Sequence, residues 1–152
     1  MNQQKLQITQ MEAKIKEYAP LKKVAPPPTG WIKAIRLALG MTLQQMANRL
    51  SITKQSARNI ESREQDGSIS IKSLRKAANA LDMELVYGFV PKDGTLESLI
   101  DRKARELATE IVHRTHNSMV LEDQGNSKSR IQKAIDERTE QLKREIPKVL
   151  WD

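Results

Sequence analysis

Residues 31–81 read WIKAIRLALGMTLQQMANRLSITKQSARNIESREQDGSISIKSLRKAANAL and contain the clearest structural pattern of the chain. Apolar residues recur there at spacings of three and four in four short blocks, which predicts four short amphipathic helices. Between the second and third blocks, residues 51–53 leave room only for a tight turn, where a buried Ile52 would hold two helices at a steep angle. Helix caps are expected at Thr42 and Thr53, and helix ends at Gly40 and Gly67. Together these signals predict a helix-turn-helix unit.

The same residues resemble the phage-repressor/Cro family of helix-turn-helix proteins. The matching positions are Arg36, Gly40, Thr42, Ala47, Leu50, Ser56, Ile60 and Glu61. The chain departs from the family at Leu43, where members usually carry a glutamine that touches the DNA backbone. We therefore expect that phosphate contact either to be absent or to be made by Gln44.

Composition and charge narrow the class of protein. The 152 residues include no cysteine, which excludes disulfides, thiolate metal sites and a cysteine nucleophile. No window approaches the roughly 18 consecutive apolar residues of a membrane span, and no signal peptide is apparent, so we expect a cytoplasmic protein. Residues 1–28 carry a net charge of +3, residues 29–91 carry +4, and residues 92–152 carry none. Because excess Lys and Arg attract polyanions, we expect DNA to bind residues 1–91 and not the C-terminal part of the chain.

The flanks of the helix-turn-helix region divide the chain into three predicted parts. Residues 1–28 hold an amphipathic helix, with Ile8, Met11, Ile15 and Tyr18 as its seam, followed by a proline-rich linker. That helix is too short to be stable alone, so it must pack on its own body or on a partner. Residues 29–91 form the DNA-binding domain. Residues 92–152 hold two amphipathic helical stripes, each too narrow for a separate core, which either fold back on the domain or face another protein.

A period of two replaces the helical period after Leu81. Over residues 83–90 an apolar side chain occurs at every second position, from Met83 to Phe89, which predicts one β-strand. A lone strand leaves backbone groups unpaired, so we expect it to pair with a second copy across a two-fold axis; a short strand elsewhere in the chain is the alternative. The region also resembles the strand of HipB-like antitoxins, in which it forms an intermolecular ribbon. The predicted dimer residues are Leu85, Val86, Tyr87 and Phe89. The predicted fold is thus mainly α: a four- or five-helix domain with one strand and extra terminal helices.

Over nearly its full length the chain resembles the family called mobile mystery protein A. The resemblance rests on residues 27–36, 38–42, 114–124 and 150–152. Members are similar to antitoxins, and the resemblance implies a neighbouring gene for a Fic-domain toxin, a class of protein that transfers AMP.

The residues expected to read DNA lie at the start of the second helix of the motif. Such residues project into the major groove, where Gln and Asn pair with adenine and Lys or Arg with guanine. The predicted DNA-binding residues are Thr42, Gln44, Thr53, Lys54, Gln55, Ser56, Arg58, Asn59 and Arg63. Further phosphate contacts are expected from Trp31, Lys33 and residues 68–70.

Two other groups of residues in the last third of the chain resemble functional motifs. Glu110, His113 and His116 are spaced by three, but this spacing drifts around a helix, so packing or hydrogen bonding is favoured over a metal site. Residues 118–123 match the Ser/Thr-x-x-x-Glu-Gly/Asn motif of Fic-inhibiting antitoxins except at Asp123. No catalytic constellation and no cofactor motif is present, so we expect neither an enzyme nor a bound cofactor.

The predicted function is a sequence-specific repressor that is also the antitoxin of a toxin–antitoxin pair. It is expected to bind an inverted-repeat operator in double-stranded DNA as a homodimer. A free-standing phage or mobile-element repressor and a protein-interaction module without operator binding are the alternatives.

Overall fold

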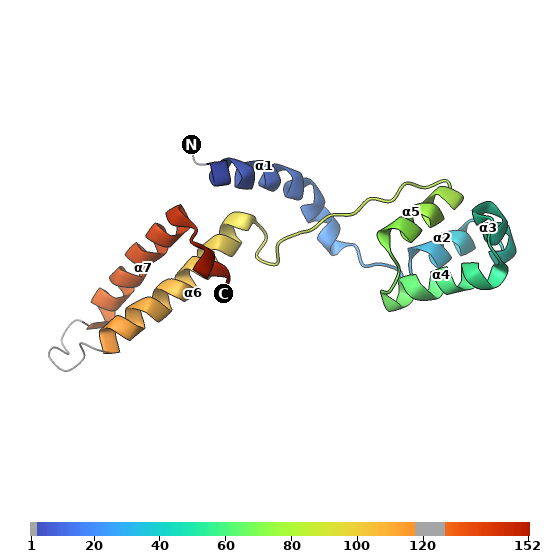
Figure 1. Cartoon of the computed structure of the whole chain (residues 1–152). Coiled ribbons are helices and arrows are strands. Elements are labelled where there is room, and N and C mark those ends of the chain that lie inside the picture. Colours follow the sequence, from blue (N-terminus) through green and yellow to red (C-terminus); the bar gives the residue numbers. More distant parts are fainter. Residues whose placement is uncertain (1–2, 118–126) are drawn as a thin grey trace. The chain divides into compact units, whose positions relative to one another are not determined.

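The computed structural model describes residues 3–117 and 127–152 (Figure 1). Within them the chain is helical, with no strand. The elements in order are α1 (Gln3–Tyr18), the 3-10 helix η1 (Ala19–Lys23), α2 (Trp31–Ala38), α3 (Leu43–Leu50), α4 (Lys54–Asp66), α5 (Ile71–Ala80), α6 (Leu96–Asn117), α7 (Ser127–Glu145) and the 3-10 helix η2 (Lys148–Trp151). None of these helices is long and apolar enough to cross a membrane.

Contacts divide the chain into two compact units. Leu21–Gly88 form the first, here called the central unit. Met1–Pro20 and Phe89–Asp152 form the second, the terminal unit, so the two ends of the chain fold together.

The central unit contains the four helices that the pattern of residues 31–81 predicts. Its core joins α2, α3 and α5 through Ile32, Met46, Ala77 and the adjoining Leu81, all at most 4% exposed. Ala47 and Ala57 are completely buried, which lets α3 and α4 approach closely at the turn. Burial of these small and medium side chains provides the main stabilising free energy of a unit with few aromatic residues. The four predicted helices are confirmed.

The terminal unit is built on a hairpin of α6 and α7. The two helices form their own core from Ile100, Ala104, Ala108, Ile135 and Leu142, closed by Ile146 and Leu150. The prediction that neither stripe is wide enough for a separate core is therefore wrong. Small buried residues explain this: Ala104, Ala108 and Thr139 have no exposed surface and let the helices lie close together.

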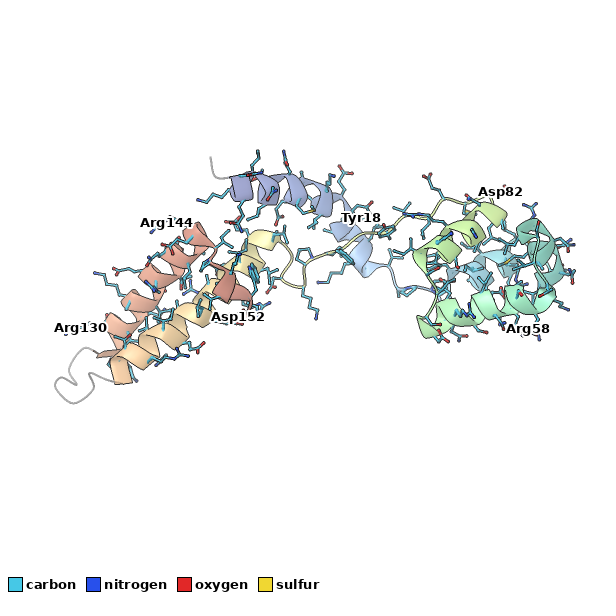
Figure 2. All side chains as sticks on the ribbon, in the orientation of Figure 1. Tyr18, Arg58, Asp82, Arg130, Arg144 and Asp152 are labelled. Atoms are coloured by element: carbon cyan, nitrogen blue, oxygen red, sulfur yellow. The ribbon has the colours of Figure 1, made fainter. Side chains whose placement is uncertain are left out.

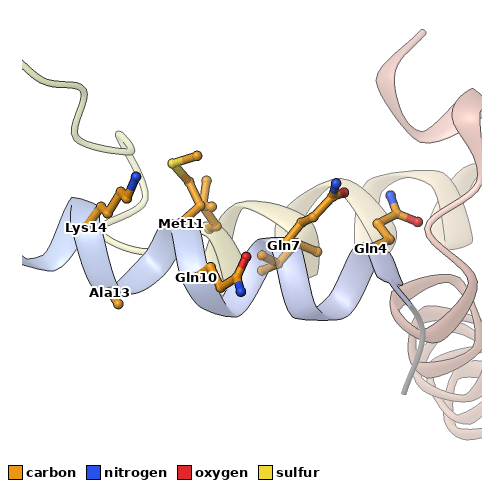
Figure 3. A pocket seen from close by; sticks show the side chains of 8 residues that line it. Gln4, Gln7, Gln10, Met11, Ala13 and Lys14 are labelled. Carbon is orange, nitrogen blue, oxygen red and sulfur yellow. The ribbon is translucent and has the colours of Figure 1, made fainter.

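Within the terminal unit, helix α1 packs on the α6–α7 hairpin, as expected for a helix too short to stand alone. It buries none of its residues fully, and Ile8 is its contact with the hairpin core. Glu12 adds a polar contact, because its carboxylate accepts hydrogen bonds from the backbone N–H groups of Leu96 and, at 3.2 Å, Glu97. A hollow lies along α1 (Figure 3). It is lined by residues that include Gln4, Gln7, Gln10, Met11 and Lys14.

The structure contradicts the predicted strand over residues 83–90. Residues 83–90 are irregular, and no partner strand exists among the residues that the structure describes. The alternation of side chains is present in the sequence, but a strand is defined by ladder hydrogen bonds, and residues 83–90 form none with the described part of the chain. Val86, Tyr87 and Phe89 are 65%, 54% and 86% exposed, and the Arg75 guanidinium lies 5.8 Å from the Tyr87 ring centre.

Candidate nucleic-acid interface

The candidate interface begins with two helices that meet at a tight turn. Thr42 caps α3 in a capping box: its hydroxyl accepts the N–H of Gln45 at 3.0 Å, and the Gln45 side chain accepts the N–H of Thr42 at 2.8 Å. Ser51 then adopts the left-handed conformation, with φ of 55°, and ends α3. Thr53 caps α4 by accepting the N–H of Ser56. The caps predicted at Thr42 and Thr53 are confirmed, whereas Ile52 is only half-buried.

A buried ion pair fixes α4 against α2. Both guanidinium nitrogens Nε and Nη2 of Arg36 donate to the Glu61 carboxylate at 2.9 Å, in a two-pronged pair. The side chains are 9% and 7% exposed, and Arg36 also donates to the carbonyl of Met41 at 3.0 Å. The hydrogen bond to Glu61 raises the pKa of Arg36 above its ordinary value. The pair holds the inner face of α4 and leaves its outer face free.

A second glutamate of α4, Glu64, caps the start of α2. Its two carboxylate oxygens accept the backbone N–H groups of Trp31 and Ile32, each at 2.8 Å. Gly30 is the N-cap and has no side chain to do this. The φ of Gly30 is +89°, which strains any other residue, and a Cβ there would lie 2.8 Å from Glu64 Oε1 and displace the capping carboxylate. Sequence reasoning missed Glu64, because local spacing does not connect residues more than thirty positions apart.

The outer face of α4 carries the side chains predicted to read DNA. Lys54, Gln55, Ser56, Arg58, Asn59 and Arg63 are all exposed, while Ala57 and Glu61 are buried. Figure 2 labels Arg58 on this helix. The structure thus brings these predicted residues together on one helix face. Thr53 is exposed at the start of α4, and Thr42 and Gln44 are exposed at the start of the neighbouring α3.

Several of these polar groups already have partners in the free protein. Thr53 Oγ1 donates to Ser56 Oγ at 2.9 Å, so both hydroxyls belong to the cap of α4. Gln55 Nε2 donates to Asn59 Oδ1 at 3.1 Å, one helical turn later. Gln44 makes the equivalent bond to Asn48 on α3 at 2.9 Å. The basic side chains of Lys54 and Arg58 are exposed to solvent.

The additional phosphate candidates lie in two places. Trp31 is 47% exposed and Lys33 half-buried at the start of α2, where Glu64 already occupies the first two N–H groups. Ser70 caps α5 through its hydroxyl. Ser68 donates both its backbone N–H and its hydroxyl to the Asp66 carboxylate. These two hydrogen bonds from Ser68 lower the pKa of Asp66 below its ordinary value. The serines are therefore committed to local structure.

The charge of the chain is concentrated in the unit that carries this face. Residues 21–88 hold eleven Lys and Arg against five Asp and Glu, for a net charge of +6, and the rest of the chain carries +1. A basic unit with an exposed polar helix face is the electrostatic footprint of a protein that binds nucleic acid.

The remaining candidate residues lie on α6. Glu110 pairs with Arg114 one turn later, His113 is exposed, and His116 is half-buried. Among the residues described, no group of three or more His, Asp or Glu side chains is placed to hold a metal ion. Residues 118–123, which carry the near-match to the Fic-inhibiting motif, lie outside the described residues.

Comparison with protein families identifies the type of domain that the central unit contains. The family model described as helix-turn-helix matches residues 32–87. These residues are a helix-turn-helix domain. Domains of this type occur in sequence-specific DNA-binding regulators, and the match covers all four helices whose geometry is described above. Comparison with curated proteins and with solved structures gave no match.

Proposed function

We propose that this protein is a transcriptional repressor that reads double-stranded DNA with the outer face of α4. The observation that carries the proposal is the exposed row of Lys54, Gln55, Arg58 and Asn59 on a helix fixed from behind by Glu61. A rigid helix with exposed polar side chains fits the major groove, and the net charge of +6 on the same unit favours approach to phosphates. We expect no catalytic activity and a cytoplasmic location.

We further propose that the repressor is a homodimer on an inverted-repeat operator. The dimer contact is assigned to Leu85, Val86, Tyr87 and Phe89, of which the last three are mostly exposed in the single chain. Two recognition helices on one face of DNA require half-sites about one helical turn apart. Phe89→Gln should shift the protein from dimer to monomer in sedimentation. Leu37→Gln removes another exposed apolar side chain, 57% exposed and away from this segment of the chain, and is the control that should stay dimeric.

The antitoxin role is the third part of the proposal. It is supported by the resemblance to the mobile mystery protein A family and by a terminal unit of little net charge. That unit exposes apolar side chains, among them Leu6, Met11, Val149 and Trp151, and such surfaces bind protein more readily than DNA. The partner implied by the resemblance is a Fic-domain toxin.

The experiment that tests the repressor is an operator shift assay with the upstream DNA of the gene. Gln55→Ala and Arg58→Ala should each weaken specific binding about tenfold while leaving binding to random DNA nearly unchanged, because base contacts carry the discrimination. Equal losses on both DNAs would contradict the assignment of α4. The absence of any operator shift would favour a protein-interaction module.

The antitoxin part is tested separately by co-purification with the product of the neighbouring gene. We expect Met11→Asp and Trp151→Asp on the terminal unit to reduce co-purification, and Arg58→Ala on α4 to leave it unchanged. If no partner co-purifies while the operator shift persists, the protein is a free-standing repressor.

A further inference from the structure

The amide of Gln55 is held by its neighbour on the recognition helix. Its Nε2 donates one hydrogen to Asn59 Oδ1 at 3.1 Å, and both side chains are exposed on the outer face of α4. A glutamine amide has two N–H hydrogens and one acceptor oxygen. The bond to Asn59 therefore leaves Gln55 with one free N–H and a free Oε1.

This remaining pair of groups matches one base better than another. Adenine presents the acceptor N7 and the donor N6–H₂ in the major groove, whereas guanine presents two acceptors, N7 and O6. One N–H and one oxygen satisfy adenine completely. Guanine would require both N–H hydrogens of the amide, and one of them is already used, so Oε1 would face O6.

From this geometry we propose that Asn59 is a positioning residue that sets the base preference of Gln55. The proposal rests on the DNA-reading role of α4 proposed above. Asn59 accepts the hydrogen bond and fixes the orientation of the Gln55 amide, so that Gln55 selects adenine over guanine. Preorganisation of this kind improves discrimination without adding a contact.

The chain contains a matched control. Gln44 Nε2 donates to Asn48 Oδ1 at 2.9 Å, with the same residue types and the same spacing, but on α3. Removing the Asn48 side chain deletes an equivalent amide pair and should not change the preference at the base that Gln55 contacts.

The experiment is selection of binding sites from a random duplex DNA library by the full-length protein and its variants. Gln55→Ala identifies the position where an adenine preference disappears. At that position, Asn59→Ala should lower the preference for adenine over guanine about fivefold, part of the discrimination that one bidentate contact carries. Asn48→Ala should leave it unchanged. Thermal unfolding should be the same for all variants, because the substituted side chains are exposed.

A conservative variant separates positioning from direct reading. Asn59→Asp keeps an oxygen that accepts from Gln55 but loses the Asn59 donor and adds a charge that DNA repels. We expect weaker binding to all sequences with the adenine preference retained. The proposal is overturned if Asn59→Ala keeps the preference, or if Asn59→Asp loses it, which would make Asn59 itself a base contact. Failure of the wild-type protein to select any sequence would overturn the proposed function as well.

Discussion

The central unit joins two of its helices with a buried ion pair between distant residues, whereas an ion pair between α6 and α7 in the terminal unit is exposed. Arg36 and Glu61 are 25 positions apart and nearly inaccessible to water. Arg105 and Asp136, which join α6 to α7, are 46% and 55% exposed. A buried charge that loses its partner is strongly unfavourable, whereas an exposed one is solvated. Losing one charged partner should therefore destabilise the central unit more than the terminal unit, although both units are held by apolar cores.

Both units nevertheless share one type of helix cap. In each, a glutamate from a distant helix accepts the first two backbone N–H groups of another helix: Glu64 at the start of α2 and Glu12 at the start of α6. These donors have no partner within their own helix, and a negative charge there is favourable. The difference lies in the helix that provides the glutamate, since α4 is well packed while α1 buries no residue.

The largest expected effect comes from Glu61→Ala, which leaves the Arg36 charge buried without its partner. We expect the central unit to lose about 3–5 kcal/mol of unfolding free energy. Asp136→Ala should cost the terminal unit at most about 1 kcal/mol. The two tryptophans, Trp31 and Trp151, lie one in each unit, so urea unfolding followed by fluorescence in Trp151→Phe and Trp31→Phe backgrounds reports each unit separately. Equal losses in both units would contradict the comparison.

The two capping glutamates should differ in the extent of their effect. Glu64→Ala should lower the unfolding free energy of the central unit by about 1 kcal/mol, as for the loss of a helix cap. Glu12→Ala should act locally, because α1 is held by little else and is too short to be stable alone. Hydrogen exchange should show lost protection in α1 with the α6–α7 hairpin unchanged. Global unfolding of the terminal unit by Glu12→Ala would show that α1 belongs to its core.

The charge difference between the units predicts a smaller effect, on salt dependence. Lys54→Gln should lower the slope of log affinity against log salt by about 1 if Lys54 neutralises one phosphate. Lys133→Gln, an exposed lysine of the terminal unit, should not change it. Operator binding between low and physiological salt measures both slopes. An equal change for the two lysines would place the terminal unit on DNA as well.

The smallest effect is on pH dependence. The Arg102 guanidinium donates to Asp93 at 2.7 Å and lowers the pKa of Asp93 below its ordinary value. A lowered carboxyl pKa contributes stability above the ordinary value of about 4, and this contribution is lost as the pH falls through the folded-state pKa. The melting temperature of the terminal unit should therefore fall slightly in acid. Asp93→Asn should flatten this part of the profile, and an unchanged profile would show that the pair is too solvated to matter.

Predictions based on neighbouring residues agree with the structure. Thr42 and Thr53 cap helices because a hydroxyl needs only the N–H three residues later, and Gly67 ends α4 with φ of +81°. The exposed face of α4 also follows from helical period, because Ala57 and Glu61 point inward. The alternation over residues 83–90 was an unreliable guide, since period two describes side chains and says nothing of a pairing partner.

Sequence patterns therefore predicted the four helices of the central unit, the caps of α3 and α4, the turn between these two helices, and the basic charge of this part of the chain. These depend on residues within about four positions or on composition. Only the tertiary structure decided the caps by Glu64 and Glu12, the core between α6 and α7, and the folding together of the two chain ends. Each of these joins residues distant along the chain. Such contacts form where packing brings helices together, and local spacing carries no record of which helices will meet.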